Sequence, residues 1–104
     1  MLGAAQESWL EAGLTALPAR RNVLAQQFLF AEFRQGMAAK PLWWTAAWDG
    51  YPAARRRQTD FMVARKIANP IILDGDVHCF YATDIRAIFL TRGRRWWPAC
   101  SSAP

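Results

Sequence analysis

The segment Pro70-Ile-Ile-Leu-Asp constrains the fold of this chain most, because it is short, apolar almost to its end and contains two β-branched residues. A short strand of this kind is typical of a parallel sheet. Its two faces are normally buried, and each of its edges normally pairs with a neighbouring strand. An incomplete sheet would leave one edge and part of one face exposed. Such surfaces favour self-association, which we therefore expect of this chain.

The other elements predict an α/β fold. Leucine recurs with helical spacing over 5–17, and a proline begins a second helix over about 52–67. The short apolar run at 22–27 is consistent with a buried strand. A further strand is expected at 79–83, after the strand at 70–74.

Charge is distributed unevenly along the 104 residues, whose formal net charge is +5. Residues 1–85 hold nine Lys or Arg and eight Asp or Glu, whereas 86–104 hold four Arg and no acid. The basic excess therefore belongs to one end of a nearly neutral domain. We expect no specific binding to nucleic acid.

Chain length and apolar patterning indicate one small domain. No run of about 18 apolar residues is present, so no transmembrane segment is expected. The start Met1-Leu-Gly-Ala lacks the basic and apolar regions of a signal peptide. Cys79 lies in an apolar stretch, which predicts a buried thiol.

Polar residues follow the strand at 70–74 directly, in Asp74-Gly-Asp-Val-His78. Open α/β sheets bind ligands at the carboxyl ends of their strands. Carboxylate and imidazole groups suit Fe, Mn, Zn or Ca, and an extended backbone would point Asp76 and His78 the same way. The alternative is an ordinary turn after a strand, with a turn aspartate and a surface histidine. The spacing alone leaves both interpretations open.

A second polar segment, Trp48-Asp-Gly-Tyr-Pro52, closes a loop at 36–50 that holds three tryptophans. Loops so rich in tryptophan cover either a core or a ligand cleft. Asp-Gly is also a turn signal, so the segment is equally an ordinary loop leading into a helix. We expect the arginines at 55–57 to form a solvated helix face.

Four segments occur in the same order in PhoD-like phosphatases, which the chain resembles over roughly residues 1–86. They are Met1-Leu-Gly-Ala-Ala-Gln-Glu-Ser-Trp-Leu10, Asn22-Val-Leu-Ala-Gln-Gln27, Trp48-Asp-Gly-Tyr-Pro-Ala-Ala-Arg55 and Leu73-Asp-Gly-Asp-Val-His-Cys-Phe-Tyr-Ala-Thr-Asp84. The resemblance identifies 1–86 as the C-terminal part of such a domain. It ends at 86, and we expect 87–104 to be a divergent, disordered tail.

The resemblance implies a calcineurin-like metallophosphatase, a β-sandwich flanked by helices, of which this chain would supply the later half. It implies hydrolysis of phosphate monoesters and diesters with bound metals, including calcium and iron, by proteins that are often secreted or periplasmic. By position, Asp76 is expected to ligate metal, and His78 to ligate metal or contact phosphate as a catalytic residue. Asp49 and Tyr51 are expected to line the substrate cleft.

Two departures from the family accompany this resemblance. Asp74 stands where the family usually has a small residue, often Ser. The family's early metal-binding segments precede anything in this chain, so we expect it to be inactive alone. Two other readings stay open, a non-catalytic truncated remnant and a small interaction module that binds an acidic partner through the tryptophan loop and the basic tail.

Overall fold

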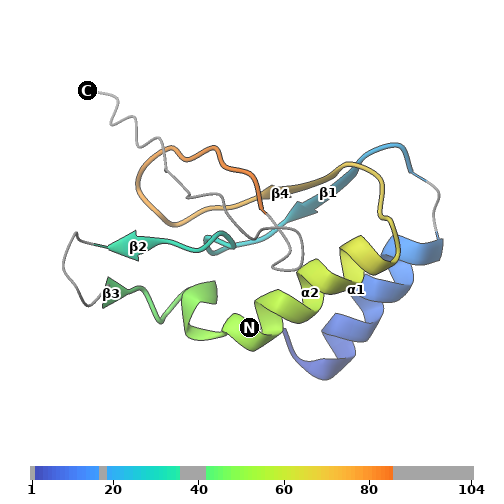
Figure 1. Ribbon diagram of the computed structural model, residues 1–104, viewed down its shortest axis with the longest axis horizontal. Coiled ribbons are helices and arrows are strands. Elements are labelled where there is room, and N and C mark those ends of the chain that lie inside the picture. The colour runs from blue at the N-terminus through green and yellow to red at the C-terminus, as the bar shows by residue number, and fades with distance from the viewer. Residues whose placement is uncertain (1, 17–18, 36–41, 86–104) are drawn as a thin grey trace.

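The structure is a computed structural model that describes residues 2–16, 19–35 and 42–85 (Figure 1). Its helices are α1 (Ala4–Ala16) and α2 (Pro52–Ala64), with a 3-10 turn, η1 (Trp48–Gly50), directly before α2. Its strands are β1 (Asn22–Ala25), β2 (Arg34–Gln35), β3 (Leu42–Trp43) and β4 (Pro70–Leu73). None of the described helices is long and apolar enough to cross a bilayer.

The central pairing joins β1 to β4 in parallel, with Val23 opposite Ile71 and Ala25 opposite Leu73. Parallel neighbours need a crossover connection, and α2 lies in the one that joins these two strands. β2 and β3 form a separate antiparallel pair. The two predicted helices and the strands expected at 22–27 and 70–74 are thus confirmed. The first helix begins one residue earlier than expected, and the other three elements are slightly shorter.

The two faces of the β1–β4 pair differ in exposure. Val23, Ile71 and Leu73 share one face and are 57%, 43% and 56% exposed. Leu24 and Ile72 point to the other face and are half-buried. In Figure 1 both helices lie on one side of the pair, and no described helix or strand covers the opposite side. The apolar sequence of these strands predicts that both faces are covered, but the described elements cover only one.

The described core lies where α2 meets η1 and the loop after β1. Its apolar members are Leu29, Phe30, Ala47, Trp48 and Met62. The rings of Phe30 and Trp48 pack with their centroids 4.7 Å apart. The tryptophan loop was expected to cover either a core or a ligand cleft. Trp48 fits the first alternative, because its side chain is buried in the core.

α1 and α2 lie side by side and are joined by polar contacts at Glu7 (Figure 1). Arg57 donates to the two carboxylate oxygens of Glu7 at 2.9 and 3.1 Å, and the buried Gln58 donates at 3.0 Å. The hydrogen bonds from Arg57, and secondly from Gln58, lower the pKa of Glu7. This carboxylate therefore links the two helices in its charged form.

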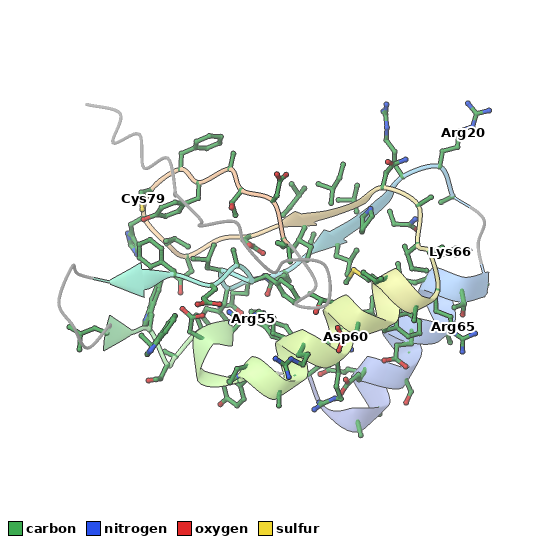
Figure 2. All side chains as sticks on the ribbon, in the orientation of Figure 1. Arg20, Arg55, Asp60, Arg65, Lys66 and Cys79 are labelled. Atoms are coloured by element: carbon green, nitrogen blue, oxygen red, sulfur yellow. The ribbon has the colours of Figure 1, made fainter. Side chains whose placement is uncertain are left out.

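The strand expected at 79–83 does not form, because the chain leaves the extended conformation before reaching it. Asp76 and His78 both have a φ of 60°, which is left-handed, and the residues after them are bends and coil. Cys79 is consequently exposed rather than buried, and in Figure 2 it lies on a loop far from Arg20. The expected disordered tail at 87–104 lies outside the described residues.

Candidate active site

A hydrogen-bond network joins the carboxyl ends of the two parallel strands. Gln26 directly follows β1, and its backbone N–H donates to Leu73 of β4 at 3.0 Å. Its side-chain oxygen accepts from the indole N–H of Trp48 at 2.9 Å, and its side-chain nitrogen donates to the Asp74 carboxylate. The network fixes the strand ends to each other and to η1.

Asp49 is held by a second set of polar contacts. Its side chain is only 3% exposed, and its Oδ1 accepts from Arg55 at 2.6 Å. Its Oδ2 accepts from the backbone N–H of Phe33 at 3.0 Å. Arg55 is 15% exposed and also faces Glu32 at 3.7 Å, so the expected solvated arginine face is wrong at this position. The cause is the buried Asp49 carboxylate in the 3-10 turn before α2, which holds Arg55 inward.

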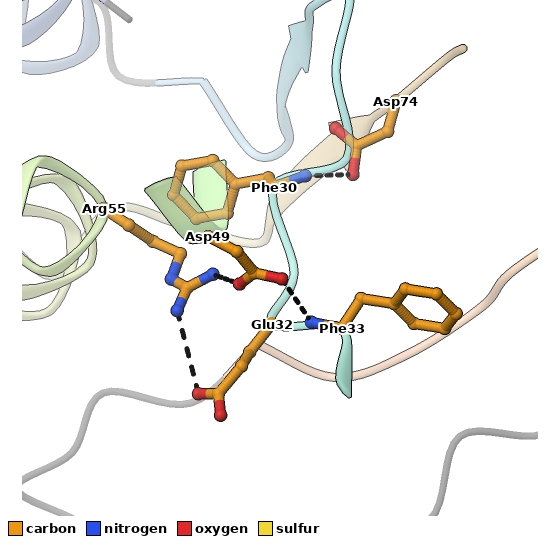
Figure 3. Close-up of polar contacts among 6 residues, drawn as sticks. All are labelled: Phe30, Glu32, Phe33, Asp49, Arg55 and Asp74. Atoms are coloured by element: carbon orange, nitrogen blue, oxygen red, sulfur yellow. Dashed lines mark hydrogen bonds and ion pairs between the residues drawn. The ribbon is translucent and has the colours of Figure 1, made fainter. Parts of the chain in front are cut away.

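Two carboxylates from different polar segments thus pin one loop, the stretch 28–33 that follows β1 (Figure 3). Asp74 accepts from the N–H of Phe30 at 2.9 Å, and Asp49 accepts from the N–H of Phe33. Charge-assisted bonds of this kind are about twice as strong as neutral ones. Phe33 in turn packs edge-on against Tyr81, with ring centroids 5.1 Å apart, which ties the loop to the segment after His78.

Tyr51 follows the same turn but stays open to solvent. Its residue is 48% exposed, and its backbone N–H is bonded to the carbonyl of Trp48 at 2.9 Å. Among the members of the Trp48–Tyr51 segment, the tyrosine side chain is therefore free to meet a ligand, whereas the oxygens of Asp49 are already engaged within the protein.

Asp76 and His78 lie beyond the end of β4 and come together there. The His78 Nε2 and an Asp76 carboxylate oxygen are 3.9 Å apart, and the side chains are 88% and 51% exposed. Both residues have left-handed φ angles, which aspartate and histidine adopt more readily than most residues, and Lys66 and Asn69 have them too. The pair converges through these angles rather than through the extended backbone expected from the sequence.

The four site residues predicted from sequence fall into two separate pairs. No hydrogen bond or ion pair joins Asp49 or Tyr51 to Asp76 or His78 in the part of the chain that the structure describes. Likewise, no cluster of three or more His, Cys, Asp or Glu side chains forms there.

Sequence reasoning missed Gln26, which lies at the centre of the strand-end network. The signal that could have identified Gln26 is its position. It directly follows β1, just as Asp74 directly follows β4, and the two strands pair in parallel. The rule that brings Asp74 to the carboxyl edge of the sheet applies equally to Gln26. The pairing of β1 with β4 had to be known before this rule could be used.

The arrangement defines a mixed α/β protein with polar residues at the carboxyl ends of a parallel strand pair, where folds of this class bind ligands. A family model described as PhoD-like phosphatase matches residues 1–97. The chain belongs to the PhoD-like phosphatase family. The match extends past residue 86, where the resemblance was expected to end.

Two relatives show the extent of the similarity. The chain is 40% identical over 89 residues to Alkaline phosphatase D of Bacillus subtilis (strain 168), a match that covers 86% of this chain and 15% of that protein. A solved structure described as "Structure of PhoD" matches with a TM-score of 0.78 and 41% identity, and covers 85% of this chain and 17% of that one. The chain therefore spans less than a fifth of the length of either relative.

Proposed function

We propose that this chain supplies the Asp76–His78 edge of the active site in a PhoD-like alkaline phosphatase that hydrolyses phosphate esters with bound metals. The proposal extends to the architecture, a metallophosphatase β-sandwich of which β1 and β4 are two strands. The observation that carries it is the meeting of Asp76 and His78, 3.9 Å apart, just beyond β4 in a chain of this family.

The carboxylate of Asp76 and the imidazole of His78 could supply some, but not all, of the ligands of a metal ion. A carboxylate and an imidazole suit iron, and a carboxylate suits calcium, the metals that we propose for the complete enzyme. Both side chains are open to solvent, so their donor atoms are accessible. Two ligands do not complete a coordination sphere, and no larger cluster of such side chains exists among the described residues. The remaining ligands would have to come from elsewhere in a complete domain.

Bound metals would activate water and stabilise charge on the phosphoryl oxygens during in-line displacement. The residues of this chain have distinct parts in that reaction. Asp76 would hold metal, and His78 would hold metal or donate a hydrogen bond to a phosphate oxygen. Tyr51, which is exposed, would contact the ester. Asp49 and Asp74 would act indirectly, because their oxygens are used to fix the 28–33 loop beside the site.

The neighbouring aspartates provide a matched test in a chimera, in which residues 1–86 replace the matching region of Bacillus subtilis alkaline phosphatase D. Asp76→Asn removes a charge and nearly keeps shape, and should lower metal content and cut turnover by about 10–100-fold or more. Asp74→Ser restores the residue that the family usually has at this position, so we expect nearly unchanged turnover.

Metal content and turnover of a phosphate ester should be measured on the same preparations of both variants. A chimera that tolerates Asp76→Asn but loses activity and metal with Asp74→Ser would show that the site has been assigned to the wrong aspartate.

A further inference from the structure

The exposed face of the β1–β4 pair is a feature of the fold that the proposed chemistry does not use. Val23, Ile71 and Leu73 on this face are 57%, 43% and 56% exposed, and Ala25 lies opposite Leu73 in the register. All four are apolar, and they come from both strands. Single apolar residues on a surface are ordinary, but a continuous patch of them marks an interaction site.

The backbone of the pair is open as well. Within the described ranges, β1 and β4 have only each other as strand neighbours, so each leaves one edge unpaired. Parallel strands are normally covered on both faces, and a two-stranded sheet is at best marginal alone. The surface therefore suits a polypeptide that adds a strand at an edge and lays apolar side chains over the face.

The relatives indicate which polypeptide that is. The solved PhoD structure superposes on 85% of this chain, yet the match takes up only 17% of that protein. In such a relative, the same fold is accompanied by a much longer stretch of chain. We propose that the β1–β4 face is a docking surface for the part of a PhoD-like domain outside the match, and that this part binds when supplied as a separate polypeptide.

This inference rests on the family and on the open face, and it does not depend on the catalytic roles proposed above. Its test is to produce the tagged 104-residue chain together with Bacillus subtilis alkaline phosphatase D that lacks the matching region. Joint production lets the two polypeptides fold in each other's presence. We expect them to copurify as a one-to-one complex.

Two valines of similar exposure give a matched pair of variants. Val23 lies on the proposed surface and is 57% exposed, whereas Val63 lies on α2 and is 51% exposed. Val23→Lys would place a charge in the covered face and should weaken the complex by at least about tenfold. Val63→Lys should leave it unchanged. Leu73→Glu is a second surface variant. Circular dichroism of each chain should be measured to check that the helices are retained.

A complex that is lost with Val23→Lys and Leu73→Glu but kept with Val63→Lys supports the docking surface. The absence of a complex, a partner that stays insoluble, or equal binding by all variants would overturn it. A chain that assembles only with itself through Val23 would also overturn it, because the occupant would then be a second copy. A complex that forms but hydrolyses no ester leaves the docking surface standing and counts against the proposed function.

Discussion

At the scale of single residues, Gly50 shows why the Trp48–Tyr51 segment needs its glycine. A Cβ atom at this position would lie 2.0 Å from the backbone carbonyl oxygen of Thr45. No rotamer change relieves an overlap with backbone, so the turn must open if any side chain is added. The turn carries Trp48 into the core and Asp49 to the 28–33 loop, so its opening would disturb both.

We therefore expect Gly50→Ala to destabilise the chain by about 1–3 kcal/mol, the usual cost of forcing atoms into a packed site. Gly13 provides the control, because a Cβ there meets nothing within 4 Å. In helix α1, Gly13→Ala should raise stability by about 0.5–1 kcal/mol. Urea unfolding of both variants measures the difference. Equal effects of the two substitutions would contradict the close approach at Gly50.

The roles of the candidate site residues stay predictions, but the structure does show which partners their side chains have. The order of the segments was enough to mark Asp49, Tyr51, Asp76 and His78 as candidates. The partners of Asp49 were not visible, because Phe33 is 16 positions earlier and donates through its backbone, which every residue except proline can do. Backbone donors leave no trace in a sequence, so a buried structural carboxylate resembles a ligand-binding one.

At the scale of elements, the contact between α1 and α2 depends on the charge of Glu7. The hydrogen bonds from Arg57 and Gln58 to this carboxylate lower its pKa below the ordinary value of 4.5. A group with a lowered pKa in the folded state stabilises the fold above its unfolded pKa. This contribution is lost as the pH falls through the folded value.

We accordingly expect the unfolding midpoint to be flat above pH 5 as far as Glu7 is concerned, and to fall below about pH 4. Glu7→Gln should be less stable than the natural chain at neutral pH, and the difference should shrink in acid. The measurement is the urea midpoint of both chains between pH 3 and pH 7. A constant difference over this range would mean that the Glu7 charge does not join the helices.

Elements with a strong local signal were predictable, and those that depend on distant pairing were not. The apolar run at 70–74 and the leucine spacing of the first helix each determine their element locally. The segment 79–83 is also apolar, but among the described residues it pairs with no strand, and it follows two left-handed residues. Apolar content alone cannot distinguish a strand from an exposed loop, as Phe80 illustrates at 72% exposure.

At the scale of the whole molecule, most of this chain matches a small part of the solved PhoD structure. The parallel pair of this chain has an open apolar face, and Asp76 and His78 are the two metal ligands that we propose, whereas a metal needs more. Self-association through the sheet edge remains a prediction, which size measurement on the isolated chain would check. Both observations support our proposal that the chain acts together with further polypeptide.

The most direct measurement of this central claim is turnover of a chromogenic phosphate ester at alkaline pH, with calcium and iron supplied. The purified chain and the chimera carrying its residues 1–86 should be assayed side by side. We expect no turnover above background from the chain alone and metal-dependent turnover from the chimera. Turnover by the chain alone that survives stringent purification, or a folded chimera without activity, would contradict the claim.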